Sequence, residues 1–139
     1  MSEVNTGRLL INAFRRFEGR LLERLKEAGY NEATPGHLAA LRHLDPEGLQ
    51  ISRLAEDAGV SRQAMSEMVR ELMARGWVKK EPDPDDGRAK LITYTAEGHE
   101  LIAEAQEAVA EIEDEVVEML GGETYAELRS ALQEMTVRL

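Results

Sequence analysis

One stretch constrains the fold of this chain more than any other: Ile51–Arg75, with the sequence ISRLAEDAGVSRQAMSEMVRELMAR. In its first half, Leu54, Ala55 and Ala58 share one apolar side of a short helix. Gly59 then interrupts the pattern, where a left-handed turn conformation suits a residue that has no side chain. The stretch therefore predicts two short helices joined by one tight turn.

The second of these helices is predicted to begin at Ser61, whose side-chain oxygen can cap it, after Val60 fills the turn. Its apolar residues occupy one half of the helical wheel: Ala64, Met65, Met68, Val69, Leu72 and Met73. A small residue at position 55 allows the two helices to cross closely, and a glycine follows it four positions later. This pattern indicates a helix-turn-helix, although an ordinary helical hairpin is the alternative for the stretch taken alone.

The polar half of the second helix indicates what the motif could bind. It carries Arg62, Gln63, Ser66, Glu67 and Arg70. Arginine, glutamine and serine side chains can donate hydrogen bonds to guanine and adenine edges in the DNA major groove. A face that is only solvated more often carries glutamate and lysine in paired spacing. Glu67 and Glu71 lie at the margin of this polar face and count against this interpretation.

The net charge of −10 over 139 residues is unusual for a DNA-binding protein, so its location matters. Residues 1–48 hold seven basic and seven acidic side chains, and residues 49–95 hold eight of each. Residues 96–139 hold two basic and twelve acidic side chains, which is the entire excess. Because salt screens phosphate attraction within about 8–10 Å, only a local cationic patch is needed. The charge pattern permits DNA binding by the middle segment and excludes it for the last third.

A β-hairpin is predicted directly behind the helix-turn-helix, at residues 77–95. Residues 77–81 run extended, residues 82–88 are rich in turn-forming residues, and residues 90–95 alternate as a strand does. A hairpin in this position is a wing. Its tip offers Arg88, flanked by Lys90, and narrow minor grooves attract inserted arginine. The alternative for Arg88 is a surface pair with Asp85 or Asp86, and both can hold because a carboxylate can pre-position a guanidinium.

The remaining segments are predicted to be helical. Residues 7–28 and 96–120 repeat apolar residues every three or four positions, and a last helix follows Gly121-Gly122. Thr34-Pro35 marks the start of another helix, since threonine can cap it and proline suits the first helical position. Residues 49–51 are long enough for a single extended pairing, after which Ser52 is expected to cap the next helix.

These elements predict one mainly α domain of residues 1–139 with a small β-hairpin wing. The winged helix-turn-helix would span about 34–95, and the helices at about 7–28 and 96–139 would form a dimerisation region. The long helices have apolar seams that a compact monomer cannot cover, so a homodimer through the two chain ends is expected.

Several classes of function are disfavoured. The absence of cysteine excludes disulfides and thiolate metal sites. No apolar run approaches ~18 residues, so neither a membrane span nor a signal peptide is predicted, and a cytoplasmic protein is expected. The histidines, His37, His43 and His99, have no nucleophile or metal-ligand spacing around them. We therefore expect no catalytic site, cofactor or metal, although histidines and carboxylates could still converge on zinc after folding.

The order of elements resembles that of the multiple-antibiotic-resistance regulator (MarR) family over nearly the full chain. Two runs carry the resemblance best: LAEDAGVSRQAMSEMVRELMARGWV and DPDDGRAKLITYTAEG. The second run is similar to the wing signature of the family, with Asp86, Arg88, Leu91, Thr95 and Gly98 at its positions. The resemblance implies a homodimeric transcriptional regulator, with repression favoured, that binds double-stranded DNA at inverted repeats. It also implies release by a small organic effector, phenolic or otherwise anionic.

The resemblance also assigns roles to residues. The major-groove face would be Arg62, Gln63, Ser66 and Arg70, with Ser61 and Ser52 near phosphates. The wing would contribute Arg88 and Lys90, with Asp86 positioning the arginine. Effector-binding candidates are Arg16, His37 and Leu41. Many family members have a basic residue at the position of Glu67 and an acidic one at that of Arg70, so the operator cannot be copied from a relative.

A second function stays open at this point. A winged helix can serve as a protein-interaction module without binding an operator, its acidic tail helices contacting a basic partner. A gel shift against genomic fragments at low and moderate salt separates the two functions, because only a DNA-binding regulator retains a fragment.

Overall fold

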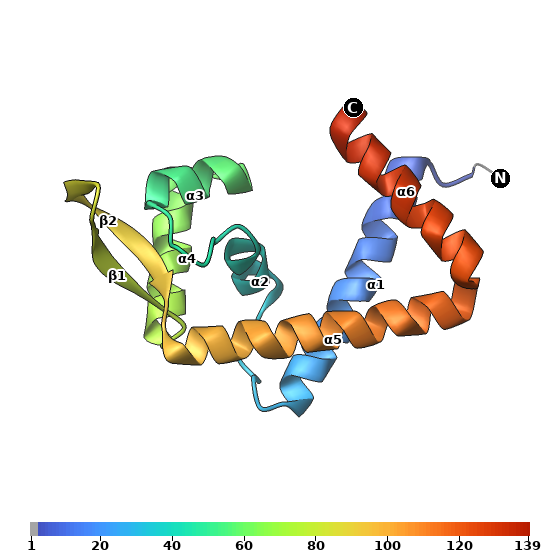
Figure 1. Cartoon of the computed structure of the whole chain (residues 1–139), viewed down its shortest axis with the longest axis horizontal. Helices are drawn as coiled ribbons and strands as arrows, with labels where there is room; N and C mark the ends of the chain where they lie inside the picture. Colours follow the sequence, from blue (N-terminus) through green and yellow to red (C-terminus); the bar gives the residue numbers. More distant parts are fainter. Residues whose placement is uncertain (1–2) are drawn as a thin grey trace. The chain divides into compact units, whose positions relative to one another are not determined.

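The described residues, 3–139, form six helices and one two-stranded antiparallel sheet in the computed structural model (Figure 1). In chain order the elements are α1 (Thr6–Glu27), α2 (Pro35–Arg42), α3 (Ile51–Ala58), α4 (Arg62–Ala74), β1 (Val78–Asp83), β2 (Asp86–Tyr94), α5 (Ala96–Leu120) and α6 (Gly122–Arg138). The predicted fold class, mainly α with a β-hairpin wing behind a helix-turn-helix, is confirmed.

The chain divides into two compact units. The winged unit is Leu22–Ala105, and the terminal unit is Met1–Leu21 with Gln106–Leu139. The predicted boundary of the winged domain at about 34–95, and the dimerisation role of the terminal helices, stay predictions.

Local sequence signals explain where most helices begin. Thr34 and His37 form a reciprocal capping box at the start of α2, with both N–H···acceptor distances at 3.2 Å, and Pro35 occupies the first helical position. The Ser61 hydroxyl accepts a hydrogen bond from the Ala64 amide at 3.0 Å and caps α4. Gly59 ends α3 in the left-handed conformation, with φ at 69°. The predicted turn and these caps are confirmed.

The start of α3 differs from the prediction. The helix begins at Ile51, one residue before the expected cap at Ser52, and Ser52 lies inside it. Gln50 occupies the capping position and makes no side-chain cap hydrogen bond. The backbone bridge between Leu49 and Ile92 sets this boundary, because it keeps the chain extended up to the start of the helix at Ile51.

The core of the winged unit lies among the end of α1, helices α2, α3 and α4, the start of α5 and the hairpin. Its largest fully buried side chains are Leu25, His37, Leu54, Val69, Leu72, Ile92 and Leu101. Helix α4 contacts α2, α3 and β1, and its buried residues are Met65, Val69 and Leu72. These three form a narrow stripe at i, i+4 and i+7. The predicted apolar half of α4 was therefore too wide: Ala64 and Met73 lie at the margins of the stripe and are exposed.

The hairpin is tied to the helices at its base. Val78 pairs with Tyr94 at the start of the ladder, and the register shifts between Pro82 and Asp83 near the tip. The Tyr94 hydroxyl donates to the backbone carbonyls of Leu41 (3.0 Å) and Leu44 (3.1 Å). The end of β2 is thereby fixed to the C-terminal end of α2.

The terminal unit has few buried side chains. Helix α6 has none, and exposed large apolar residues lie on both end helices: Leu9, Leu10, Ile11, Phe14, Leu128, Leu132 and Val137. Ion pairs link Arg20 with Glu115 (2.8 Å) and Arg129 with Glu113 (3.0 Å). Among the described helices, none combines the length and apolarity that crossing a bilayer requires. The terminal unit thus exposes large apolar side chains on both α1 and α6.

Candidate nucleic-acid interface

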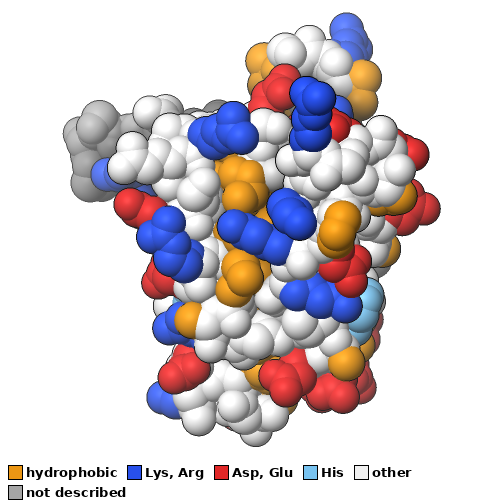
Figure 2. All heavy atoms as spheres, turned by 90° about the vertical axis from the view of Figure 1, so that its left-hand side faces the viewer, with side chains coloured by type: hydrophobic (Ala, Val, Ile, Leu, Met, Phe, Trp, Pro, Cys, Tyr) orange, Lys and Arg blue, Asp and Glu red, His pale blue; other side chains and the backbone are white. Residues whose placement is uncertain are grey.

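The predicted recognition strip is the polar face of α4 from Arg62 to Arg70, and it lies on the surface of the winged unit. Arg62, Gln63 and Arg70 are exposed on α4, and Ser66 is half-buried between them. Ser61, which caps the helix, is exposed at its N-terminal end. Figure 2 faces the side of the hairpin and α4 and shows lysine and arginine side chains around an exposed apolar stripe. The strip is therefore free to meet a ligand, as a DNA-reading surface must be.

An apolar hollow of about 220 Å³ lies beside this strip. It is bounded by small or apolar side chains of α2, the turn and α4, among them Ala39, Val60, Ala64 and Met68. Val60 was expected to fill the turn, but it is 45% exposed. Small residues on α2 and α4 explain the difference, since they leave space that Val60 borders without filling. Exposed methyl groups here could contact thymine C5-methyls, a role that the sequence analysis did not assign.

The wing tip presents Arg88 and Lys90, both of which are exposed. An Asp86 carboxylate oxygen accepts a hydrogen bond from the Arg88 backbone amide at 3.2 Å. Within residues 3–139, no ion pair joins the Arg88 guanidinium to Asp85 or to Asp86. Asp86 thus orients the backbone of the wing arginine, and the guanidinium remains available to a phosphate or a groove.

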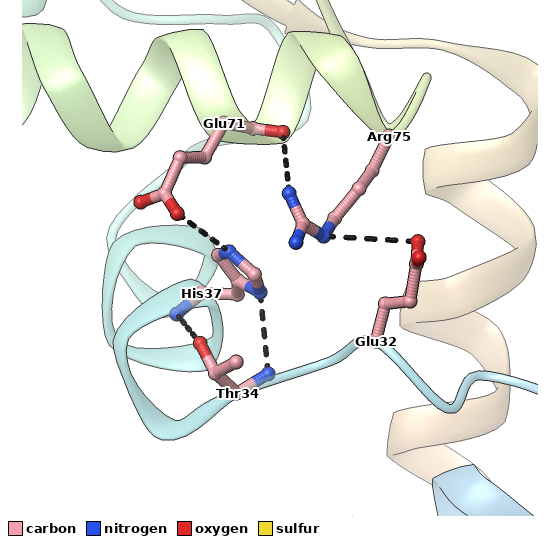
Figure 3. Close-up of polar contacts among 5 residues, drawn as sticks. All are labelled: Glu32, Thr34, His37, Glu71 and Arg75. Carbon is pink, nitrogen blue, oxygen red and sulfur yellow. Dashed lines mark hydrogen bonds and ion pairs between the residues drawn. The ribbon is translucent and has the colours of Figure 1, made fainter.

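His37, an effector candidate, belongs to a polar cluster at the start of α2 (Figure 3). Its side chain is 2% exposed, and its Nδ1 accepts from the Thr34 amide, so the neutral ring carries its proton on Nε2. A Glu71 carboxylate oxygen lies 4.0 Å from Nε2. Arg75 donates from Nη1 to the Glu71 carbonyl at 3.3 Å, and its Nε lies 3.9 Å from Glu32.

Burial lowers the pKa of His37 below its ordinary value, and the Arg75 charge lowers it further, against the opposing effect of Glu71. His37 is therefore a neutral member of the helix cap near pH 7. Leu41 is buried, and its carbonyl accepts from Tyr94. Arg16 is exposed on α1 and belongs to the terminal unit. The effector-binding role of these three residues stays a prediction.

The described residues contain no group of three or more histidines and carboxylates that could hold a metal ion. Convergence of these residues on zinc, which the sequence left open, therefore has no candidate site within residues 3–139.

Comparison with known proteins places this geometry in a family. Residues 33–89, from the start of α2 to the wing tip, match the model of the MarR family. The transcriptional regulator HosA of Escherichia coli O111:H- is 30% identical over 93 residues, which are 66% of this chain and 69% of HosA.

Solved structures share the fold over nearly the whole chain. MarR from E. coli, in its apo form, has a TM-score of 0.76 at 21% identity, covering 96% of this chain and 98% of MarR. The transcriptional repressor CouR bound to a 23-mer DNA duplex has a TM-score of 0.67 at 27% identity, covering 97% of this chain and 99% of CouR. CouR from Rhodococcus jostii RHA1 bound to p-coumaroyl-CoA has a TM-score of 0.74 at 24% identity, covering 99% of this chain and 98% of CouR.

The family match contains the helix-turn-helix that carries the exposed strip, and it extends into the hairpin as far as the wing arginine. The similarity to HosA extends over two thirds of each chain. The chain belongs to the MarR family and is a winged helix-turn-helix transcriptional regulator.

Proposed function

We propose that this protein is a sequence-specific DNA-binding repressor that acts as a homodimer on an inverted-repeat operator in the cytoplasm. One observation carries the proposal: Arg62, Gln63 and Arg70 lie exposed on α4, within the same compact unit as the exposed wing arginine. Such side chains read base edges in the major groove, while a wing arginine contacts the backbone or the minor groove. The repressor CouR, which has this fold, is known bound to a DNA duplex.

The terminal unit supplies the argument for a dimer. Exposed leucines and a phenylalanine on α1 and α6, with no buried side chain on α6, leave apolar surface that a second copy would cover. A two-fold dimer would present two recognition helices about 34 Å apart, and hence half-sites one helical turn apart. Sedimentation of the purified protein measures this: a dimer is expected, and Phe14→Asp should shift it toward monomer. A monomeric parent would contradict the proposal.

Release of DNA by a small organic anion is part of the proposal. CouR, with p-coumaroyl-CoA bound, supports a ligand-responsive regulator of this fold. His37 and Leu41 are buried in the core of the winged unit, so a ligand that reached them would disturb the packing beneath α4. A panel of phenolic and other aromatic carboxylates should include a compound that weakens operator binding at fixed salt, and a panel without effect would count against the predicted ligand class.

The decisive experiment is selection of genomic fragments by the purified protein, followed by gel shifts at low and moderate salt. Gln63→Ala should change the preferred bases by about 1–3 kcal/mol of discrimination at the affected position. Arg88→Ala should weaken binding to all sequences and reduce the salt slope by about one.

Lys79→Ala is a matched control for Arg88→Ala, because Lys79 is an exposed wing cation already paired with Glu81 at 2.9 Å. It should affect binding less than Arg88→Ala does. Failure to retain any fragment at either salt concentration would refute operator binding and favour a winged-helix protein-interaction module. Equal operator affinity of Arg88→Ala and the parent would refute only the role of the wing.

A further inference from the structure

Gln50 occupies the capping position of α3, but its side chain does not cap that helix. Its amide nitrogen instead donates to Asp83 Oδ2 at 2.8 Å, across 33 residues of sequence. Asp83 is the last residue of β1 and is 8% exposed. The Gln50 side chain thus connects the start of α3 to the end of β1.

Asp83 lies where the hairpin departs from a regular ladder. Pro82 pairs with Lys90, but the next residue, Asp83, pairs with Asp86, so the register shifts at this point. The other carboxylate oxygen, Oδ1, accepts from the Asp85 amide at 2.9 Å. Hydrogen bonds from the Gln50 side chain and from the Asp85 and Asp86 backbone hold the pKa of Asp83 below its ordinary value. The charged carboxylate therefore holds the backbone of the tip at the point where the ladder changes register.

The other end of this connection is held by the core. Leu49 and Ile92 exchange two backbone hydrogen bonds, Leu49 N–H to Ile92 O at 3.1 Å and Ile92 N–H to Leu49 O at 2.8 Å. Gly48, with φ at 93°, packs so closely that a Cβ there would lie 2.7 Å from Thr93 Cγ2. Gln50 therefore projects from a backbone that is fixed against buried Ile92, and it can restrain the more exposed tip.

We propose that Gln50 is a positioning residue for DNA binding: its hydrogen bond to Asp83 fixes the wing tip and so holds Arg88 where it meets the duplex. The inference rests on the proposed function. An isolated two-stranded hairpin is marginal in water, so the tip depends on such a connection for its order. Without this hydrogen bond, Arg88 would remain exposed and charged, but the wing tip would be free to move. Ordering the tip on DNA would then cost conformational entropy, a cost that the hydrogen bond removes before binding.

A double-mutant cycle with Gln50→Ala and Arg88→Ala tests this role on the full-length protein and its selected operator. Gln50→Ala should weaken operator binding about 3–10-fold, which corresponds to the net contribution of one ordinary intramolecular hydrogen bond. In the Arg88→Ala background, Gln50→Ala should change affinity less than twofold, because it acts through Arg88. Asn31→Ala, which removes an exposed side-chain amide elsewhere in the winged unit, is the control and should bind as the parent does.

Amide exchange measured by NMR reads the connection itself, independently of DNA. The Asp85 and Asp86 amides should exchange faster in Gln50→Ala than in the parent, while amides of α5 stay unchanged. Urea unfolding identifies any general loss of stability, which would instead speed exchange throughout the winged unit.

The outcomes separate the two claims. Undiminished weakening by Gln50→Ala in the Arg88→Ala background would overturn the positioning role, as would unchanged affinity or unchanged exchange at Asp85 and Asp86. If the parent binds no DNA at all, the proposed function fails instead, and the exchange data still decide whether Gln50 orders the tip. A Gln50→Ala protein that only loses free energy of unfolding, with no coupling to Arg88→Ala in operator affinity, would point to a purely structural residue.

Discussion

Replacing Gly98 by alanine tests how α5 is joined to the hairpin. Gly98 lies in the first turn of α5, and a Cβ built there would be 2.0 Å from the Trp77 carbonyl oxygen and 3.2 Å from Tyr94 Cδ1. That carbonyl accepts a hydrogen bond from the Thr95 amide at 3.1 Å. The obstacle is backbone, so it cannot rotate away as the end of a flexible side chain could.

The magnitude follows from three opposing effects. Alanine is favoured over glycine inside a helix by about 1 kcal/mol. Forcing an extra methyl into a packed site costs about 1–3 kcal/mol. Moving the Trp77 carbonyl aside weakens its hydrogen bond from Thr95, which is worth about 1 kcal/mol. The net expectation is a loss of roughly 1–3 kcal/mol, and hence a fall in Tm of about 3–10 °C at fixed protein concentration.

Thermal and urea unfolding of Gly98→Ala measure this loss, with Gly19→Ala as the matched control. Gly19 is also helical, in α1, but a Cβ there would meet nothing within 4 Å. Gly19→Ala should therefore gain up to about 1 kcal/mol from helix propensity alone. The two substitutions should change stability in opposite directions. A Gly98→Ala protein as stable as the parent would refute the argument from close packing.

Three further predictions concern the base of the winged unit. Because the pKa of His37 in the folded state lies below 6.5, the stability that its neutral form contributes is present above pH 6.5 and is lost as the pH falls toward that lower value. His37→Asn should flatten this dependence in urea unfolding measured from pH 7 to 5, and an unaltered slope would exclude His37 as its source. Burial raises the pKa of Tyr94 to about 12, and Tyr94→Phe should destabilise the protein by about 1–2 kcal/mol because the hydroxyl no longer donates to the carbonyls of Leu41 and Leu44. Thr34→Ala should lower the free energy of unfolding by about 1 kcal/mol through loss of the α2 cap, whereas Thr34→Ser should retain most of it.

The features that sequence predicted well depend on few neighbouring residues. The left-handed turn at Gly59, the cap at Ser61 and the cap at Thr34 each involve interactions within three or four positions. The hairpin also followed from local alternation and turn-forming residues. Such features survive folding because the tertiary environment has little reason to override them.

The features that sequence missed depend on distant contacts. The Leu49–Ile92 bridge moved the start of α3 ahead of Ser52, and Gln50 reached Asp83 where no local pattern indicated a partner. Val60 became exposed because helices separated in sequence left a hollow beside it. These positions could not be predicted from sequence, because each depends on how helices and strands that are distant in the chain pack together.

The candidate interface divides in the same way. The chemistry of the strip, from Arg62 to Arg70, and the position of Arg88 at a hairpin tip could be predicted from residue types and periodicity. That the strip is exposed, and that Asp86 holds the backbone of Arg88 and leaves its guanidinium unpaired within residues 3–139, required the folded chain.

By itself, the sequence determined the order of elements, the helix ends set by caps and glycines, and the family, because these arise from local propensity and from short motifs. The tertiary structure decided which apolar residues are buried, that His37 is a neutral buried cap residue, and what holds the wing tip. Burial and hydrogen bonding between residues far apart in the chain depend on the closure of several elements around one core, and no local pattern encodes that closure.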